Sequence, residues 1–302
     1  MASERADSIE QPALAVELCG IPLATPLIPA AGTLAREALE EVRGVYGAML
    51  PKTVTPAPRS GNPPPRVAEA ASGMVNSIGL QNPGLERFLK DLDDYDVGVP
   101  LFASVAADTV GEFAAMCERL VGEERVAAVE LNLSCPNVER GGLQFCAGPW
   151  AVREVIAACR GALDGKPMFV KLTSERVVTN AVAAEEAGAD ALTLINTVPA
   201  LVVDARARRV FLRGGLSGPA IKPVALWAVH EVSKVVEVPL IGVGGVAGGT
   251  DVAEFMLAGA TAVQVGSGSF VREPRLVLEE FATYLREQGV FARDLTGTLA
   301  GY

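Results

Sequence analysis

Short apolar segments alternate along the chain with longer segments of helical spacing. The apolar segments are continuous and bounded by Gly and Pro, which is typical of parallel strands buried on both faces. They cover residues 27–30, 47–50, 101–106, 127–133, 168–172, 189–195, 238–243 and 262–265. Helical spacing occurs between them at residues 109–121, 150–163, 179–187 and 251–258.

These eight strand-like segments predict an α/β fold in which the sheet closes into a (β/α)8 TIM barrel, with an open doubly wound sheet as the alternative. A chain of 302 residues commonly forms one barrel rather than two domains. We therefore expect a flexible N-terminal segment over residues 1–12 and a single barrel domain over residues 13–302.

Three connections are too long to be plain turns: residues 52–82, 136–149 and 196–218. Long connections in compact domains are usually functional. Each of them follows a predicted strand and is expected as an active-site loop at the C-terminal face, where barrel enzymes keep their active sites.

Polar residues and glycines gather at the ends of the predicted strands, and a barrel brings such ends to one mouth. They are Lys52, Asn132, Ser134, Cys135, Lys171, Asn196, Thr197, Gly244, Gly245, Gly266 and Ser267. Glycine-rich turns after the seventh and eighth strands are the usual phosphate site of a barrel, because bare backbone N–H groups can approach an anion closely. The competing interpretation is that these glycines only permit tight turns.

Lys52 and Lys171 both follow or end a strand and face a mostly apolar pocket. Lysine is rarely buried without a partner, and a phosphate, a carboxylate or a reduced cofactor would supply one. A Schiff-base lysine of an aldolase is the rival interpretation of Lys171, and a solvated lysine is the third.

Five cysteines occur, and no pair has CxxC spacing, so we do not expect this chain alone to hold zinc or an iron–sulfur cluster. Cys135 lies at a strand end among hydrogen-bonding side chains, which favours chemistry over packing. Cys117 and Cys159 lie in helical patterns, where cysteine usually acts as a small buried hydrophobe, and Cys19 is also expected to be inert. The role of Cys146, in the long connection after Cys135, stays open.

The composition of the chain excludes some classes of binding partner. A formal charge of −10 argues against a nucleic acid or an anionic membrane, and no apolar run is long enough to span a bilayer. The odd cysteine count and the lack of a secretory signal favour the cytoplasm. The single histidine, His230, lies in an apolar helical run and is expected to be structural.

Four stretches resemble the class 1B dihydroorotate dehydrogenases, and the resemblance runs from about Leu14 to the C-terminus. The stretches are Gly-Asn-Pro-Pro-Pro-Arg at 61–66, Asn-Ser-Ile-Gly-Leu-Gln-Asn-Pro-Gly at 76–84, Asn-Leu-Ser-Cys-Pro-Asn at 132–137 and Gly-Gly-Leu-Ser-Gly-Pro at 214–219. Cys135 stands where the membrane-bound class 2 enzymes have serine, and no N-terminal membrane segment is found, which also points to class 1.

The resemblance implies FMN bound across the barrel mouth and dihydroorotate as the substrate. The residues that would surround the flavin are Ala31, Lys52, Thr53, Ser104, Asn132, Lys171, Ile195, Gly218, Gly244, Gly245, Gly266 and Ser267. The residues that would hold the pyrimidine are Lys52, Asn76, Ser77, Ile78, Gly79, Leu80, Asn132, Asn196 and Thr197. The resemblance also implies a homodimer, or a heterotetramer with an electron-transfer subunit that carries FAD and an iron–sulfur cluster and passes electrons to NAD.

Two residues depart from the family pattern. Ala31 and Ser104 stand where family members usually have Ser and Asn, and both positions touch the flavin in the family. These changes put two hydrogen bonds to the cofactor in doubt, whereas the base and the substrate asparagines are unaffected.

The resulting hypothesis is oxidation of dihydroorotate to orotate in pyrimidine biosynthesis. Cys135 removes a proton from the ring carbon beside a carbonyl, hydride passes to the flavin, and Lys171 stabilises the charge on the reduced ring. A dihydropyrimidine dehydrogenase-like enzyme acting on uracil or thymine is the nearest alternative. An aldolase and a non-catalytic barrel that binds a partner are more remote alternatives.

Overall fold

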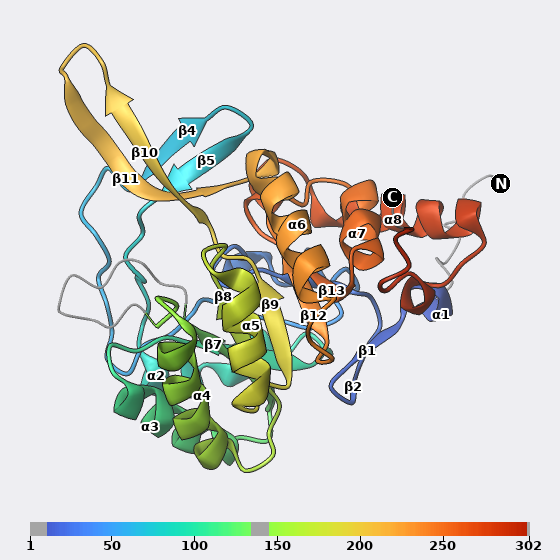
Figure 1. Cartoon of the computed structure of the whole chain (residues 1–302), viewed down its shortest axis with the longest axis horizontal. Helices are drawn as coiled ribbons and strands as arrows, with labels where there is room; N and C mark the ends of the chain where they lie inside the picture. Colours follow the sequence, from blue (N-terminus) through green and yellow to red (C-terminus); the bar gives the residue numbers. More distant parts are fainter. Residues whose placement is uncertain (1–10, 134–144, 301–302) are drawn as a thin grey trace.

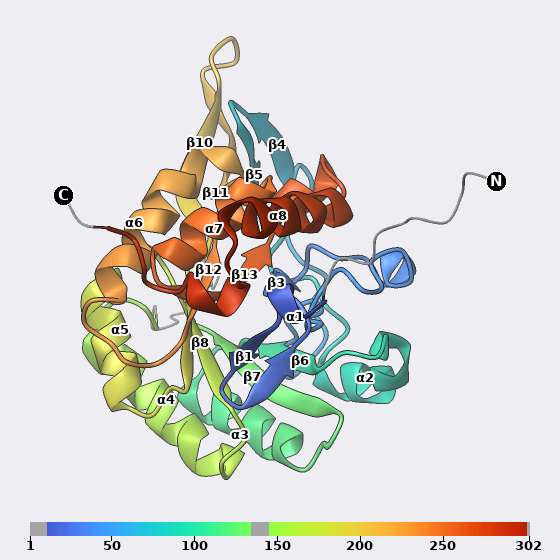
Figure 2. The ribbon, with the colours of Figure 1, turned by 90° about the vertical axis from the view of Figure 1, so that its right-hand side faces the viewer.

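Seven parallel strands form a curled sheet at the centre of the protein (Figures 1 and 2). The structure, a computed structural model, describes residues 11–133 and 145–300. The strand order is β3-β13-β12-β9-β8-β7-β6. The bounds are β3 (Leu27–Pro29), β6 (Leu101–Val105), β7 (Val126–Asn132), β8 (Met168–Leu172), β9 (Ala191–Leu194), β12 (Leu240–Val243) and β13 (Ala260–Val265).

The segment over residues 47–54 completes the ring between β3 and β6. The backbone N–H of Gly47 donates to the carbonyl of Leu27 at 2.8 Å, and Met49 forms an isolated parallel bridge with Leu101. The predicted regular strand at 47–50 is therefore wrong, although the position in the ring is right. Pro51 follows directly and lacks the N–H that a continuous ladder would use. With this segment in place, the predicted TIM barrel is confirmed.

Helices cover the outside of the ring, and Figure 2 shows them around the strands. The longer ones are α3 (Val110–Val121), α4 (Pro149–Leu163), α5 (Val177–Glu186), α6 (Lys222–Val232), α7 (Gly249–Leu257) and α8 (Pro274–Gln288). The four helices predicted from spacing all occur, each with ends within two residues of the prediction. For α3 the reason is visible in the sequence: Thr109 and Glu112 form a capping box that fixes its start.

Short elements complete the chain: α1 (Gln11–Leu14), α2 (Leu85–Lys90) and the 3₁₀ turns η1 (Arg36–Ala38), η2 (Leu92–Tyr95), η3 (Pro219–Ile221), η4 (Ser267–Phe270) and η5 (Ala292–Asp294). The small hairpin of β1 (Val16–Leu18) and β2 (Ile21–Leu23) precedes β3. Residues 11 and 12 begin α1, residues 1–10 lie outside the described part, and the flexibility expected of residues 1–12 stays a prediction.

Two of the three long connections are not plain loops. They contain β4 (Val67–Ala70) and β5 (Gly73–Asn76), and β10 (Val198–Asp204) and β11 (Arg209–Ser217). The two hairpins join into one antiparallel sheet of order β10-β11-β5-β4, which stands on one side of the barrel in Figure 1. Pairing of Gly215 with Asn76 ties the hairpins together, so segments far apart in sequence form one wall.

Ring closure at Gly47 gives a testable prediction. A Cβ on Gly47 would lie 2.0 Å from the backbone oxygen of Thr25, so Gly47→Ala forces the first two ring positions apart. We expect a loss of about 1–3 kcal/mol in the free energy of unfolding, measured by urea titration. Gly161→Ala, on an exposed part of α4 with nothing within 4 Å, is the matched control and should gain about 0.5–1 kcal/mol. Equal stability of the two variants would contradict this view of the closure.

Candidate active site

A cavity of about 380 Å³ lies where the carboxyl ends of the strands meet the four-stranded sheet. Strand ends supply its floor and the two hairpins supply one wall. Of the residues expected around a cofactor or substrate, those that line it are Ala31, Lys52, Thr53, Asn76, Ile78, Gly79, Leu80, Asn132, Lys171, Ile195, Asn196, Thr197, Gly218, Gly244, Gly245, Gly266 and Ser267. Residues from the whole length of the chain thus share one space.

Two predicted positions do not line the cavity. Ser104 is buried beneath it, where its hydroxyl contacts the Thr53 hydroxyl at 2.9 Å and donates to Glu130 at 3.4 Å. The Ser77 hydroxyl accepts a hydrogen bond from Asn62, outside the cavity. The predicted base, Cys135, and its neighbour Ser134 lie outside the described residues.

The glycines at the mouth differ in what they pack against. Gly244 and Gly245 have positive φ, and a Cβ on either would lie 2.8 Å from a side-chain carbon of α6, so close packing already requires glycine there. An added Cβ at Gly266 would meet only Ala30, at an ordinary 3.7 Å. Close packing therefore does not require glycine at position 266, and the hydroxyl of the next residue, Ser267, donates to the Ser217 hydroxyl of β11 at 2.8 Å.

Two lysines reach the cavity from different sides. The Lys52 side chain lies against Gly32, where a Cβ would come within 2.7 Å of its Cδ. Lys171 is buried, and its ammonium donates to the Gln264 amide oxygen at 3.1 Å. A third lysine nearby, Lys222, is held by Asp251 at 2.5 Å and Glu254 at 2.7 Å. Burial lowers the pKa of Lys222, but these two carboxylates outweigh it and raise the pKa overall.

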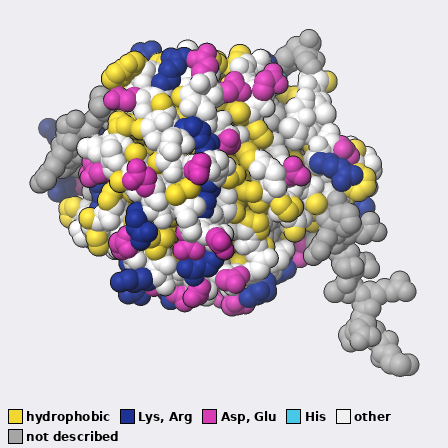
Figure 3. Space-filling view, turned by 90° about the horizontal axis from the view of Figure 1, so that it is seen from below, with side chains coloured by type: hydrophobic (Ala, Val, Ile, Leu, Met, Phe, Trp, Pro, Cys, Tyr) yellow, Lys and Arg dark blue, Asp and Glu magenta, His cyan; other side chains and the backbone are white. Residues whose placement is uncertain are grey.

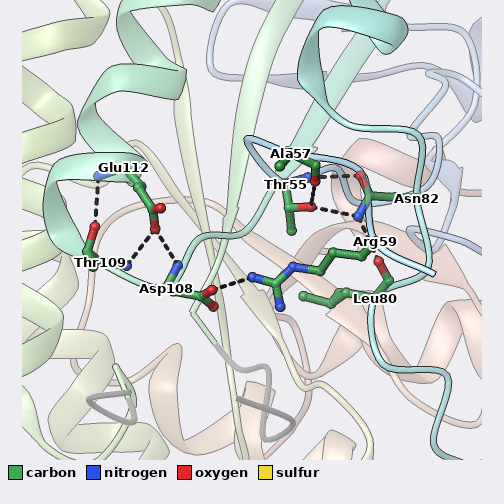
Figure 4. A network of polar contacts seen from close by, with 8 residues as sticks. All are labelled: Thr55, Ala57, Arg59, Leu80, Asn82, Asp108, Thr109 and Glu112. Atoms are coloured by element: carbon green, nitrogen blue, oxygen red, sulfur yellow. Dashed lines mark hydrogen bonds and ion pairs between the residues drawn. The ribbon is translucent and has the colours of Figure 1, made fainter. Parts of the chain in front are cut away.

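Asn82 anchors the segment that carries Asn76 to Leu80 (Figure 4). Its amide donates to the Thr55 hydroxyl at 2.8 Å and to the carbonyl of Leu80 at 2.7 Å. Its oxygen accepts from the backbone N–H groups of Thr55 at 3.1 Å and Gly84 at 2.8 Å. Leu80 has a positive φ of 53°, and the bond from Asn82 holds it there.

An ion pair fixes the same segment from outside. Arg59 donates to Asp108 at 2.6 Å, which ties residues 52–82 to the start of α3, where Thr109 and Glu112 form the helix cap (Figure 4). Because both partners are partly exposed, we expect the pair to contribute to position more than to stability.

Three other cysteines have raised pKa values. Burial raises the pKa of the Cys146 thiol to about 11, and burial together with the nearby Asp190 raises that of Cys19 to about 12. A hydrogen bond with Cys117, together with burial, raises the pKa of Cys159 far above its ordinary value. Raised pKa values keep these thiols protonated at neutral pH, so we expect an inert role for Cys146.

The sequence reasoning missed several residues of this region. Met74, Ile221 and Phe270 line the cavity, and Glu130 and Gln264 are buried under it. A charged or amide residue in the middle of an otherwise apolar strand was the available signal for Glu130 and Gln264.

Charged side chains of both signs share one face of the protein, and the described residues show neither a metal cluster nor a membrane span. Lys, Arg, Asp and Glu are intermingled on the face shown in Figure 3. Within residues 11–133 and 145–300 no cluster of three or more His, Cys, Asp and Glu side chains could hold a metal ion. No helix in the same residues combines the length and apolarity needed to cross a membrane.

The chain that forms this cavity matches a known protein family. The family model for dihydroorotate dehydrogenase matches residues 13–283. The chain belongs to the dihydroorotate dehydrogenase family. The match covers the whole ring of strands and both hairpins of the cavity wall, and it confirms the resemblance inferred from the motifs.

Similar proteins support the same family. The NAD(+)-type dihydroorotate dehydrogenase B catalytic subunit of Pelobacter propionicus is 43% identical, over 96% of this chain and 99% of its own length. Those of Geotalea uraniireducens and Trichlorobacter lovleyi are 41% and 42% identical over 96% of this chain, covering 99% and 100% of their own lengths. The crystal structure of DHODH from Eimeria tenella in complex with ferulenol superposes with a TM-score of 0.79 at 26% identity, covering 98% of this chain and 90% of the other.

Loss of the Asn82 anchor should loosen the cavity wall. Asn82→Ala leaves the Leu80 carbonyl and two backbone N–H groups without their partner in a buried place, so we expect a loss of about 1–3 kcal/mol. We also expect faster proteolytic cleavage within residues 52–82. Asn62→Ala, which removes side-chain bonds from a half-buried site in the same segment, is the control and should change both quantities little. An Asn82→Ala variant as stable and as resistant as the control would disprove the anchoring role.

Proposed function

We propose that this chain is the catalytic subunit of an NAD-linked dihydroorotate dehydrogenase, which oxidises dihydroorotate to orotate in pyrimidine biosynthesis. The observation that carries the proposal is the cavity itself. It gathers Lys52, Lys171 and the asparagines Asn76, Asn132 and Asn196 at one barrel mouth, in a chain that belongs to this family.

FMN is the cofactor we propose for the cavity. The volume of the cavity, about 380 Å³, lies within the range of small-ligand sites. Gly244, Gly245, Gly266 and Ser267 line the cavity and follow the seventh and eighth positions of the ring, where barrels bind phosphate. Glycine at position 266 is not required by close packing, and bare backbone there suits an anion that approaches N–H groups. When bound, FMN supplies the acceptor for the hydride.

Other residues that line the cavity suit a pyrimidine ring. Asn76, Asn132 and Asn196 can each donate and accept hydrogen bonds, as a ring with alternating carbonyl and N–H groups requires. We assign the substrate carboxylate to Lys52, helped by the backbone of Ile78 to Leu80. The Lys171 ammonium would stabilise the negative charge of the reduced cofactor.

Cys135 is the base we propose, on the basis of its place in the motif at 132–137. The preceding Asn132 ends β7 and lines the cavity. The thiols of Cys19, Cys146 and Cys159 have raised pKa values and are not available for this role. Cys135 would take the proton from the substrate carbon beside the ring carbonyl while hydride leaves the neighbouring carbon.

A second subunit completes the proposal. The similar proteins are named as catalytic subunits of NAD(+)-type enzymes, and such a name implies a partner. We propose a subunit that carries FAD and an iron–sulfur cluster, bound to a dimer of this chain in the cytoplasm. Family membership leaves the aldolase and the non-catalytic barrel without support, and dihydropyrimidines remain the competing substrates.

Substrate choice tests the function directly. Under anaerobic conditions dihydroorotate should bleach the flavin of the purified protein, and it should be preferred over dihydrouracil by at least about 10³-fold in kcat/KM. That ratio is the scale expected when a specific polar partner is missing. Lys52→Ala should narrow the ratio by impairing dihydroorotate turnover, with flavin content measured alongside. Equal turnover of the two compounds by the wild-type protein would move dihydropyrimidine chemistry to first place.

The base gives a separate prediction. Cys135→Ala should keep FMN but lose about 10²–10⁴-fold in turnover, the usual contribution of a general base. Cys135→Ser should regain activity as pH rises, since a hydroxyl is harder to deprotonate than a thiol. Cys146→Ala is the matched control and should turn over normally, because that thiol is buried and protonated. Near-normal rates in Cys135→Ala at neutral pH would refute the assignment.

A further inference from the structure

A layer of buried polar side chains crosses the barrel interior at and beneath the cavity floor. Its members are Thr53, Ser104 of β6, Glu130 of β7, Lys171 of β8, Thr193 of β9 and Gln264 of β13. Glu130 and Thr193 are fully buried, and Gln264 is 1% exposed. Thr53 and Lys171 reach the cavity, whereas the others lie below it.

The layer beneath this one is apolar. Residues two positions earlier on the same strands point to the same side of the sheet. They are Phe102, Ala128, Phe169, Ala191 and Ala262, all buried, and the rings of Phe102 and Phe169 meet edge to face at 5.2 Å. The polar layer therefore rests on hydrocarbon, where hydrogen bonds and charges act more strongly than in water.

Two opposite charges lie in this layer without touching. Among the described residues, Glu130 and Lys171 are the only buried Asp, Glu, Lys or Arg side chains. Buried charges normally pair directly, because each is costly alone. Here Gln264 stands between them: Lys171 donates to its oxygen at 3.1 Å, and its amide nitrogen donates to Glu130 at 2.8 Å.

The orientation of the Gln264 amide follows from its two neighbours. An ammonium group can only donate and a carboxylate only accepts, so the amide must turn its oxygen to Lys171 and its nitrogen to Glu130. The flipped amide would set donor against donor at Lys171 and acceptor against acceptor at Glu130. The hydrogen-bonding chemistry of Lys171 and Glu130 therefore determines the orientation of the Gln264 amide.

Glu130 is satisfied without the lysine. Besides Gln264, it accepts from the Thr193 hydroxyl at 3.0 Å and from the Ser104 hydroxyl at 3.4 Å. These neutral donors occupy both carboxylate oxygens. Within residues 11–133 and 145–300, the Lys171 ammonium lies at the cavity surface with one amide oxygen as its hydrogen-bond partner.

We propose that Gln264 is a positioning residue that keeps Lys171 from collapsing onto Glu130 and so holds its ammonium at the cavity floor. The inference rests on the proposed function, because the ammonium is kept there to offset the charge of a reduced flavin. Without the amide, Lys171 and Glu130 would form a direct buried ion pair, and the cavity floor would lose the Lys171 ammonium, with Lys52 the lysine still lining the cavity.

The test measures how strongly the protein prefers reduced over oxidised FMN, from the midpoint potential of bound flavin against reference dyes. Gln264→Leu should lower this preference at least tenfold, which is about 30 mV for a two-electron couple. Gln264→Met, which keeps the length and flexibility of the side chain, is measured alongside in case the leucine variant does not fold. The double variant Gln264→Leu/Glu130→Gln removes the carboxylate that attracts Lys171, so its preference should recover to within threefold of wild type.

Controls separate this role from simple damage to the barrel. Thr25→Val removes a buried hydrogen bond to Val45 at the opposite end of the barrel and should leave the potential unchanged. The inference would be overturned if the Gln264→Leu variant preferred reduced FMN to within threefold of the Thr25→Val variant. It would also be overturned if the double variant showed a preference as low as that of Gln264→Leu. A wild-type protein that binds no flavin would instead overturn the proposed function and the inference with it.

Discussion

Hydrogen bonds that close the ring of parallel strands hold every functional feature of this protein in place. The bond from Gly47 to Leu27 joins the first two ring positions, and β3 pairs with β13 on the other side. Because all strands run in one direction, closure brings their carboxyl ends to a single mouth. Lys52, Asn132, Lys171 and the glycine turns come from distant parts of the chain, and only this closure makes them neighbours.

The antiparallel sheet turns the open mouth into an enclosed site. Pairing between β5 and β11 places Asn76 beside Gly215, where both line the cavity. Asn82 and the Arg59–Asp108 ion pair hold the segment that carries the β4–β5 hairpin against the barrel. The wall is thus built from two chain segments that have no stable place without each other, since a lone two-stranded hairpin is marginal in water.

Much of this architecture was predictable from the sequence, because buried parallel strands leave a strong apolar signal. The positions of the ring strands and the strand-end residues such as Lys171 and Asn132 followed from that signal. The two hairpins did not, because sheets outside the core depend on pairing between distant segments. Glu130 and Gln264 were overlooked because apolar neighbours on both sides dominate the pattern, and their partners lie on other strands.

We propose that one cavity holds both the flavin and the pyrimidine. A crystal structure of the holoenzyme with orotate would show where both molecules bind. We predict the FMN phosphate against Gly244, Gly245, Gly266 and Ser267, and orotate beside Lys52 and the Asn76–Leu80 segment, with the Cys135 thiol facing the ring. Flavin or orotate bound outside this cavity, or a Cys135 side chain turned away from the pyrimidine, would contradict it.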